Sequence, residues 1–380
     1  MPADFSVRRW ERARRRVVAT AFLRVPFYRD QWAAAGRALA EPEPTPSAAL
    51  ADQLHRLCPF ARPFDPSLEP SPWIGDGRDL RDALALAGAP RRAPVLEVRP
   101  AVLDRRTLAG GVLPWGGGRR YGVLLAPGAR VVDGARRRAL DAAALGLAAE
   151  AGQAIVVGER AALDAVLPQL EGVRVCAVER VPLGQAVRAA RAAAAARTPQ
   201  TRVVGGVVPD RVVTGRMVTG RMVTDHAAPD HALTGHAVPD HTAADQALTG
   251  HALPGHAAAD RAVPGPPFTD HAVAAGAMVA HDPHLGYLAA VVPACGQVHL
   301  LWRHVHARPF ESPGGPTVGL TALRRRRAAL VNVVPDDAES LTTALCPAHG
   351  TPVVTPPVQP GPLPRLAPLG STTQISFTTH

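Results

Sequence analysis

The chain contains 380 residues, of which 47% are hydrophobic and only 4% aromatic, together with 34 glycines and 39 prolines. This length allows a sizeable core, while the proline and glycine content indicates that part of the chain is not folded. We find no apolar segment long enough for a membrane-spanning helix and no secretion signal, so we expect a cytoplasmic protein with no membrane partner. Four cysteines are too few for a disulfide scaffold, which favours reduced thiols or metal ligands.

The formal net charge is +10, and all 42 basic residues are arginines. Arginine clusters within residues 8–16 and 324–327 could neutralise the phosphates of a nucleic acid. However, the absence of lysine beside abundant alanine, proline and glycine is typical of a GC-rich coding sequence and requires no anionic partner. We therefore interpret most of this charge as solvated surface and keep nucleic-acid binding as an alternative.

Residues 1–39 predict an N-terminal helical segment, within which Pro26 breaks the helix. One helical stripe of this segment contains Trp10, Arg14, Val17, Ala21 and Phe22. We interpret it as a helix docked on the domain, with a basic helix on a membrane surface as the alternative. Residues 40–118 begin with a stretch rich in proline and acidic residues and are predicted to be an irregular wrap or linker.

Residues 119–208 alternate between short apolar segments and helical patterns and predict an α/β core. The apolar segments are RYGVLLA, AIVVG, VRVCAV and RVVGGVV. This order is typical of a parallel sheet with crossover helices, in which ligands bind at the carboxyl ends of the strands. We expect residues 126–128, 158–160 and 179–181 to line that crevice. The segment PWGGGRR lacks a nucleotide-binding fingerprint, so a flexible turn is favoured over a phosphate-binding loop.

Residues 209–275 repeat a five-residue phrase with aspartate or glycine at every fifth position, usually followed by histidine or arginine. A period of five fits neither a strand nor a helix. The variation within the phrase follows single-base codon changes, as an expanded DNA unit would leave. We interpret this stretch as a low-complexity insertion, with a β-solenoid as the ordered alternative, and residues 357–380 as a disordered tail.

Residues 276–356 predict a small C-terminal, mainly β module that binds zinc. Cys295 and His299 form a C-x3-H pair, and Cys346 and His349 form a C-x2-H pair. Glycine and proline near each pair supply the tight turns that would direct both side chains toward one ion. Two cysteines and two histidines fit tetrahedral zinc, and four protein ligands indicate a structural metal rather than a catalytic one. The alternative is two buried thiols beside unrelated histidines.

Two parts of the chain resemble the phenylacetate-CoA ligase-like adenylate-forming proteins. The segment VPFYRDQWAAAG at residues 25–36 looks like the N-terminal VPFYR segment of that family, and VGLTAL at residues 318–323 is similar to its G-x-L-x-x-T-x-L element. LVNVVPDD at residues 330–337 stands where the family carries R-Y-R-T-G-D. The resemblance implies that Asp336 or Asp337 holds the ribose of an adenylate, although Asn332 replaces the expected arginine.

The sequence lacks the motifs that carry the catalytic chemistry of this family. It contains no S-G-T-T-G-x-P loop to wrap the ATP phosphates and no lysine to stabilise the transition state, and a proline-rich segment stands where the family carries its lid domain. We therefore expect a degenerate relative that binds a small carboxylate, a nucleotide or a partner protein, with ATP or AMP as doubtful cofactors. An active AMP-forming acid ligase with atypical residues is the alternative.

Other catalytic arrangements have less support. The motifs G-x-S-x-G and H-E-x-x-H do not occur. His304 and His306 alternate along a predicted strand and could serve as acid or base beside Asp282 or His284. A solvated strand face is the favoured interpretation of these two histidines.

Overall fold

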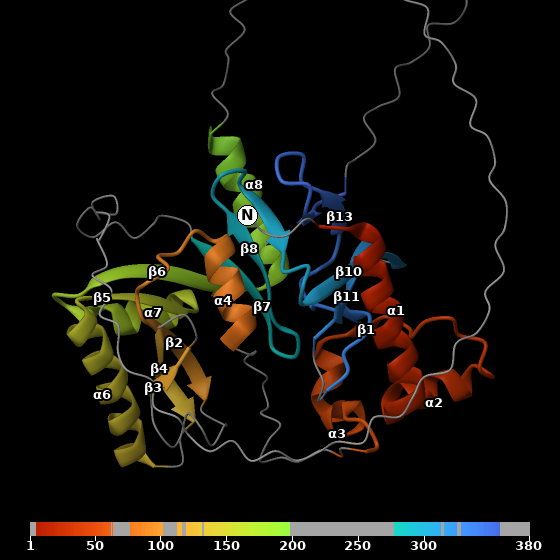
Figure 1. Cartoon of the computed structure of the whole chain (residues 1–380), viewed down its shortest axis with the longest axis horizontal. Coiled ribbons are helices and arrows are strands. Elements are labelled where there is room, and N and C mark those ends of the chain that lie inside the picture. The colour runs from red at the N-terminus through yellow and green to blue at the C-terminus, as the bar shows by residue number, and fades with distance from the viewer. Residues whose placement is uncertain are drawn as a thin grey trace, which may run out of the picture. The chain divides into compact units, whose positions relative to one another are not determined.

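The computed structural model describes residues 5–61, 63, 77–101, 112–115, 119–130, 133–197, 277–312, 315–324 and 328–357. Within these ranges the chain has a mixed α/β fold with two β-sheets and packed helices (Figure 1), which confirms the predicted α/β class. The predicted strand at residues 202–208 and the repeat at residues 209–275 lie outside the described residues, as do residues 358–380 of the tail.

Two helices open the described chain, and proline determines where one ends and the next begins. Helix α1 (Val7–Arg24) starts after Ser6, whose hydroxyl accepts a hydrogen bond from the Arg9 amide at 3.5 Å. Helix α2 (Pro26–Ala34) begins with proline at its first position, where the missing amide proton is not needed. Short elements follow as β1 (Thr45–Pro46), η1 (Ala48–Gln53) and α3 (Leu54–Leu57).

Among the described residues, ten strands form the larger sheet. Its strands lie in the order β13 (Thr342–Leu345), β14 (Pro352–Thr355), β9 (Gln297–Leu300), β8 (Gly286–Val292), β7 (Met278–Asp282), β6 (Arg174–Val181), β5 (Gln153–Gly158), β2 (Val95–Ala101), β4 (Arg120–Arg130) and β3 (Val112–Pro114). Neighbours from β4 through β2, β5 and β6 to β7 pair in parallel, and the remaining neighbours pair antiparallel.

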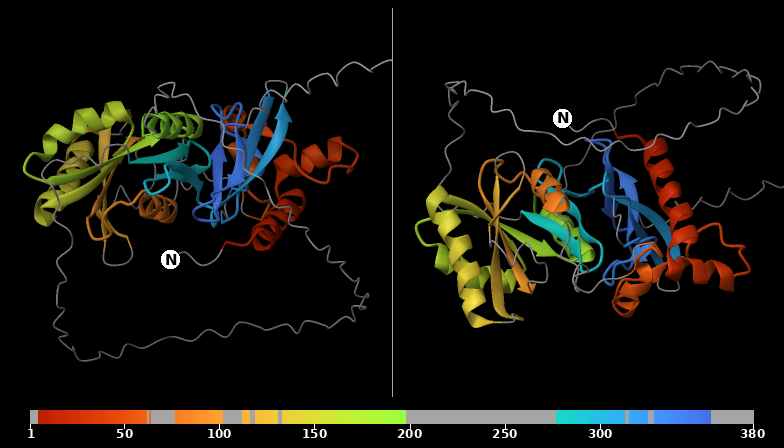
Figure 2. Two further views of the ribbon diagram at one scale, coloured as in Figure 1. Left: turned by 90° about the horizontal axis from the view of Figure 1, so that it is seen from above. Right: turned by 60° about the horizontal axis from the view of Figure 1, so that its bottom comes forward.

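Helices pack on both faces of the larger sheet (Figure 2). Successive side chains of a strand point to opposite faces, so a strand such as β2 has side chains to bury on each face. On one face Leu96 and Val98 pack against α6 (Gly134–Ala151) and α7 (Arg160–Val166), which continues into η2 (Leu167–Leu170). On the other face Val95 shares a core with α4 (Gly77–Leu86). Helix α8 (Leu183–Arg197) buries its apolar side in the core that also contains residues of β7 and β8.

The smaller sheet joins the N-terminal segment to the C-terminal one. Strand β12 (Val333–Val334) pairs in parallel with β1 and antiparallel with β11 (Gly315–Ala322), which pairs antiparallel with β10 (Val305–Ser312). Helix α1 packs beside β10, where the Trp10 indole nitrogen donates a hydrogen bond to the carbonyl of Val305 at 3.0 Å. Residues from the two ends of the described chain therefore share one core.

The prediction of an irregular segment across residues 40–118 is wrong for residues 77–101. These residues contain α4 and the strand β2, which lies inside the sheet between β4 and β5. The sequence of β2, VLEVRPA, contains a proline and two charged residues, so its local pattern resembles a linker. The fold buries Glu97 of this strand beside Arg180, which is distant in the sequence, and local periodicity cannot show such a partner.

Candidate metal centre

The first half of the candidate site is the turn between β8 and β9. The carbonyl of Val292 accepts hydrogen bonds from the amides of Cys295 at 3.3 Å and Gly296 at 2.8 Å. Gly296 has a φ of 67°, which glycine adopts without strain. The turn therefore places the Cys295 sulfur 3.1 Å from Nε2 of His299 on β9.

The second half is the turn between β13 and β14. The carbonyl of Cys346 accepts hydrogen bonds from the amides of His349 at 3.3 Å and Gly350 at 2.7 Å, and Gly350 has a φ of 62°. The Cys346 sulfur lies 3.4 Å from Nδ1 of His349. Each cysteine thus has its histidine partner within one tight turn.

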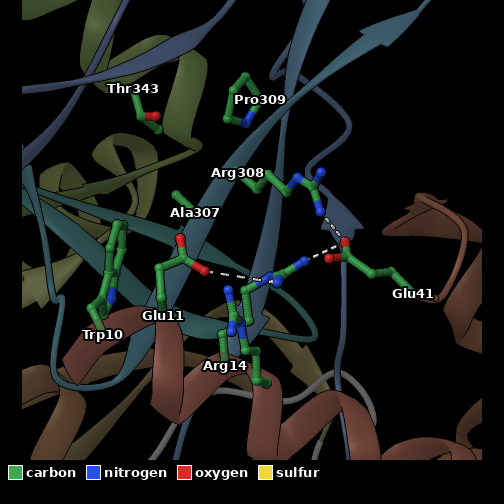
Figure 3. Close-up of a pocket in the computed structure, with 9 residues that line it drawn as sticks. Trp10, Glu11, Arg14, Glu41, Ala307, Arg308, Pro309 and Thr343 are labelled. Atoms are coloured by element: carbon green, nitrogen blue, oxygen red, sulfur yellow. Dashed lines mark hydrogen bonds and ion pairs between the residues drawn. The ribbon is translucent and has the colours of Figure 1, made fainter. Parts of the chain in front are cut away.

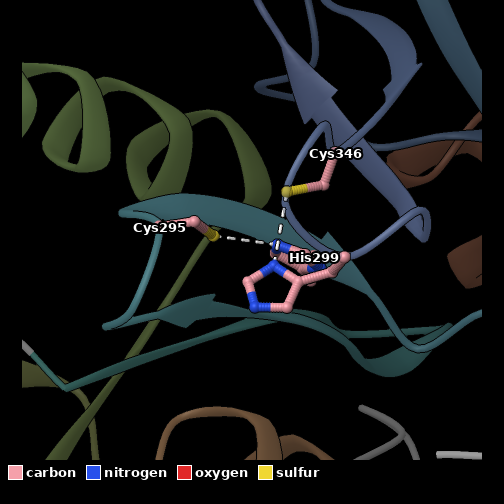
Figure 4. Close-up of side chains that lie close together, drawn as sticks. Cys295, His299 and Cys346 are labelled. Carbon is pink, nitrogen blue, oxygen red and sulfur yellow. Dashed lines mark hydrogen bonds between the residues drawn. The ribbon is translucent and has the colours of Figure 1, made fainter.

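Pairing between β9 and β14 brings the two halves together, with His299 opposite Val353 in the antiparallel ladder. The four potential ligand atoms of Cys295, His299, Cys346 and His349 all lie within 4.8 Å of one another (Figure 4). Tetrahedral zinc requires ligand atoms about 3.3–3.8 Å apart, given bonds of about 2.0–2.3 Å. The four predicted residues therefore form a group that could hold a metal ion after a small contraction.

The surroundings of the group favour the metal-binding protonation state of His299 but not that of Cys295. Burial, with the nearby His349, lowers the pKa of His299 to about 4, so this imidazole is neutral at neutral pH and can donate a lone pair. Burial and the neighbouring Cys346 raise the pKa of the Cys295 thiol, so a bound cation would have to displace its proton. The Thr351 hydroxyl lies 2.8 Å from Nδ1 of His299 and would orient Nε2 toward the metal.

The two carboxylates that the family resemblance implicates in nucleotide binding contact helix starts. Oδ1 of Asp336 accepts a hydrogen bond from the amide of Ala48 at 3.0 Å, at the first residue of η1. Oδ2 of Asp337 accepts one from the amide of Gln185 at 2.9 Å, in the first turn of α8, and lies 3.8 Å from Arg188. Both carboxylates therefore stabilise helix N-termini. Their role in holding a ribose stays a prediction.

Asn332, which stands where the family resemblance would place an arginine, is fully buried. Its Nδ2 donates a hydrogen bond to the carbonyl of Pro42 at 2.7 Å, and its amide donates one to the Thr321 hydroxyl at 3.2 Å. Asn332 has a φ of 52°, a left-handed conformation that asparagine adopts more readily than most residues. Asn332 therefore contributes to the packing of the N-terminal segment.

The interpretation of His304 and His306 as part of a solvated strand face is wrong, because both side chains are buried. Nδ1 of His304 lies 2.7 Å from Asp79, and its Nε2 lies 2.6 Å from Asp82, so it joins α4 to the turn before β10. Nε2 of His306 lies 2.9 Å from Glu11 of α1. Both pairs link segments more than 200 residues apart in the sequence.

The suggested acid-base partners have local roles. Oδ1 of Asp282 accepts hydrogen bonds from the amides of His284 at 2.8 Å and Leu285 at 2.9 Å. It therefore stabilises the turn between β7 and β8.

We expect the His304 contacts to make stability depend on pH in the alkaline range. Burial opposes the charged form, but the hydrogen bonds and charges of Asp79 and Asp82 outweigh burial and raise the pKa of His304 from 6.5 to about 9. A group whose pKa is raised in the folded state stabilises it below the unfolded pKa and loses this contribution as the pH rises through the folded pKa. The melting temperature should therefore fall between pH 6.5 and pH 9.

The replacement His304→Gln should remove this part of the pH dependence, whereas replacement of the exposed His55 by glutamine should retain it. Thermal unfolding at closely spaced pH values measures the effect. The same decline in wild type and His304→Gln would show that other groups cause it.

Sequence reasoning missed a buried charge cluster around Glu97 and an arginine-lined pocket beside α1. Glu97 contacts Arg180, which is 83 residues away in the sequence. In the pocket, Arg14 of α1 and Arg308 of β10 both contact Glu41. For the pocket, the only signal in the sequence was the position of Arg14 on the apolar stripe of the predicted helix. An arginine at such a position indicates a buried partner.

No protein-family model matches the chain, and no curated protein is significantly similar to it in sequence. Among the described residues, no helix combines the length and the apolar character needed to cross a membrane. The Cys295, His299, Cys346 and His349 group is therefore the feature from which function is best argued.

Proposed function

We propose that this chain is a zinc-stabilised, non-catalytic relative of the phenylacetate-CoA ligase-like adenylate-forming proteins, which binds a small carboxylate, a nucleotide or a partner protein without efficient ATP chemistry. The observation that carries the proposal is contact between the two segments that resemble the family. Tyr28 of VPFYR is fully buried, and its hydroxyl accepts a hydrogen bond from the amide of Val331 at 2.8 Å. Segments that resemble one family in sequence thus also pack together.

The contacts of Asn332 and Asp337 support the absence of ATP chemistry. Asn332 makes its hydrogen bonds inside the protein, and the carboxylate of Asp337 binds the start of α8. The sequence contains neither the loop that wraps ATP phosphates nor a lysine. Loss of one preorganised charge-stabilising group typically lowers a rate by about 100-fold to 1,000-fold, so loss of two would leave little activity.

We further infer that β4, β2, β5, β6 and β7 are a parallel sheet with crossover helices, and that a ligand binds near the carboxyl ends of its strands. The parallel pairings and the helices on both faces support this inference. In such sheets the ends of the strands form a crevice outside the hydrogen-bonded ladder. Gly158 and Glu159 lie at one of these ends.

Zinc in this proposal is structural, and Cys295, His299, Cys346 and His349 hold it. Thiolate and neutral imidazole ligands suit zinc, and four of them leave no position for a reacting water. The ion would join the β8–β9 turn to the β13–β14 turn. Such a cross-link stabilises the fold because the metal site does not exist in the unfolded chain.

We expect no ATP-dependent pyrophosphate exchange from the purified protein with a panel of aryl and fatty acids. The assay detects reversible adenylate formation directly, and heat-denatured protein provides its blank. Exchange above the blank would contradict the proposal and favour the active ligase. The variant Arg120→Ala would then test whether arginine replaces the missing lysine, since Arg120 is exposed and bound only to Glu150 among the described residues.

Nucleic-acid binding is the second candidate, and the structure of α1 argues against part of its basis. Arg14, in the middle of the N-terminal arginine cluster, is only 4% exposed and pairs with Glu41. Arg14 therefore adds little to an exposed basic surface. Strong salt-dependent binding to DNA would favour this candidate instead.

A further inference from the structure

A cavity of about 440 Å³ lies between α1, β10 and β13 (Figure 3). Its charged lining comprises Glu11, Arg14, Arg15, Glu41 and Arg308. Three arginines against two glutamates leave one net positive charge in the pocket. A volume of this size suits a small molecule rather than a macromolecule.

Ion pairs hold guanidinium groups of this pocket in place, but not every N–H donor has a hydrogen-bond acceptor within the part of the chain that the structure describes. Glu41 contacts both Arg14 and Arg308, which fixes these two side chains relative to each other. Nε of Arg14 is buried and has no hydrogen-bond partner among the described residues. Arg15 is exposed and has no ion pair with any described residue. Because buried donors are nearly always hydrogen-bonded, this arrangement calls for an additional acceptor.

The rest of the lining consists of Trp10, Ala307, Pro309 and Thr343. Trp10 is held by its hydrogen bond to Val305 and by the contact of its ring with the ring of His306, whose centroids lie 4.0 Å apart. Ala307 and Pro309 of β10 add further apolar atoms. The pocket thus combines positive charge with one aromatic ring, that of Trp10, which is already held in place before binding.

We propose that this pocket binds a small organic monocarboxylate with an apolar body, whose carboxylate is held by Arg14, Arg15 and Arg308. Arginine donors match the two oxygens of a carboxylate in bidentate geometry. The two glutamates in the lining disfavour a ligand with several negative charges, such as a nucleotide phosphate chain. The inference rests on the proposed function only for the binding of a small carboxylate. It names the class of carboxylate and assigns it to this pocket, whose lining does not include the strand ends at Gly158 and Glu159.

Thermal shift measurements on the full chain with benzoate test this proposal, with benzamide as the matched uncharged ligand. Benzoate should raise the melting temperature in a saturable way, because a ligand that binds the native state stabilises it, and benzamide should not. Arg308→Gln and Arg15→Gln should each weaken benzoate binding about 10-fold or more, the usual effect of losing one charged hydrogen bond. Both side chains are at least partly exposed, so these variants should fold.

Arg160→Gln is the control, since it removes one exposed arginine charge on α7 far from the pocket lining. If benzoate raised the melting temperature equally in all variants, the protein would bind a carboxylate as proposed, but this pocket would not be the binding site. Tighter binding of inorganic phosphate than of benzoate, or no shift with either benzoate or hexanoate, would overturn the proposal. Pyrophosphate exchange would instead contradict the non-catalytic function without affecting this pocket.

Discussion

The replacement Glu97→Gln is expected to lower the free energy of unfolding by about 3–5 kcal/mol, the usual cost of removing one partner from a buried ion pair. Glu97 is 2% exposed, and its carboxylate lies 3.0 Å from Nε of Arg99 and 3.4 Å from Nη1 of Arg180. The hydroxyl groups of Tyr121 and Tyr287 also donate hydrogen bonds to it. Loss of the negative charge would leave Arg180 buried without its main counter-ion.

The pH dependence of stability gives this prediction a second readout. Burial alone would raise the pKa of Glu97, but Arg99, Arg180 and the two tyrosine hydroxyls outweigh it and lower the pKa below its usual value. A carboxylate with a lowered folded pKa stabilises the protein above its unfolded pKa and loses that contribution as the pH falls through the folded pKa. Wild-type protein should therefore lose more stability on acidification than Glu97→Gln.

Urea unfolding monitored by tryptophan fluorescence measures both effects. Glu159→Gln is the matched control, because Glu159 lies 3.5 Å from the same Arg180 but is 69% exposed. An exposed ion pair contributes less than about 1 kcal/mol, so the control should change stability only slightly. Equal losses in the two variants would show that burial of Glu97 does not determine its contribution.

We expect Cys346→Ser to lose the bound zinc and to melt about 10 °C below wild type, since several kcal/mol of metal-coupled folding energy are lost. Cys58→Ser is the control, because Cys58 is as deeply buried as Cys346 and lies outside the metal group. Elemental analysis after dialysis against a mild chelator should give near one zinc per chain in wild type and in Cys58→Ser.

If zinc is structural, Cys346→Ser must lower both the melting temperature and the zinc content. Retained zinc together with an unchanged melting temperature in Cys346→Ser would exclude Cys346 as a ligand. Equal melting temperatures for Cys58→Ser and Cys346→Ser would make both cysteines ordinary buried thiols.

Local patterns were sufficient to predict most elements between residues 120 and 197. The segments AIVVG and VRVCAV have the short, apolar character of buried strands, and they form β5 and β6. The helical patterns between and after them form α7 and α8. In this part of the chain each element's own sequence carries the signal, because its buried face is apolar and its ends have turn residues.

The metal group was predicted for a different reason, since close spacing within each Cys-His pair is visible in the sequence. That the two pairs meet depends on the pairing of β9 with β14, which spacing alone does not determine. Strand β2 and the burial of His304 could not be predicted, because their charged residues are stabilised by distant partners. Glu97 depends on Arg180, and His304 depends on Asp79 and Asp82.

X-ray absorption at the zinc K-edge of the purified protein tests the proposed metal centre most directly. The account predicts two sulfur ligands at about 2.3 Å and two nitrogen ligands at about 2.0 Å, from Cys295, Cys346, His299 and His349. Histidines of the repeat at residues 209–275 could also bind zinc, but they would supply nitrogen ligands only. A first coordination shell without sulfur would therefore contradict the account.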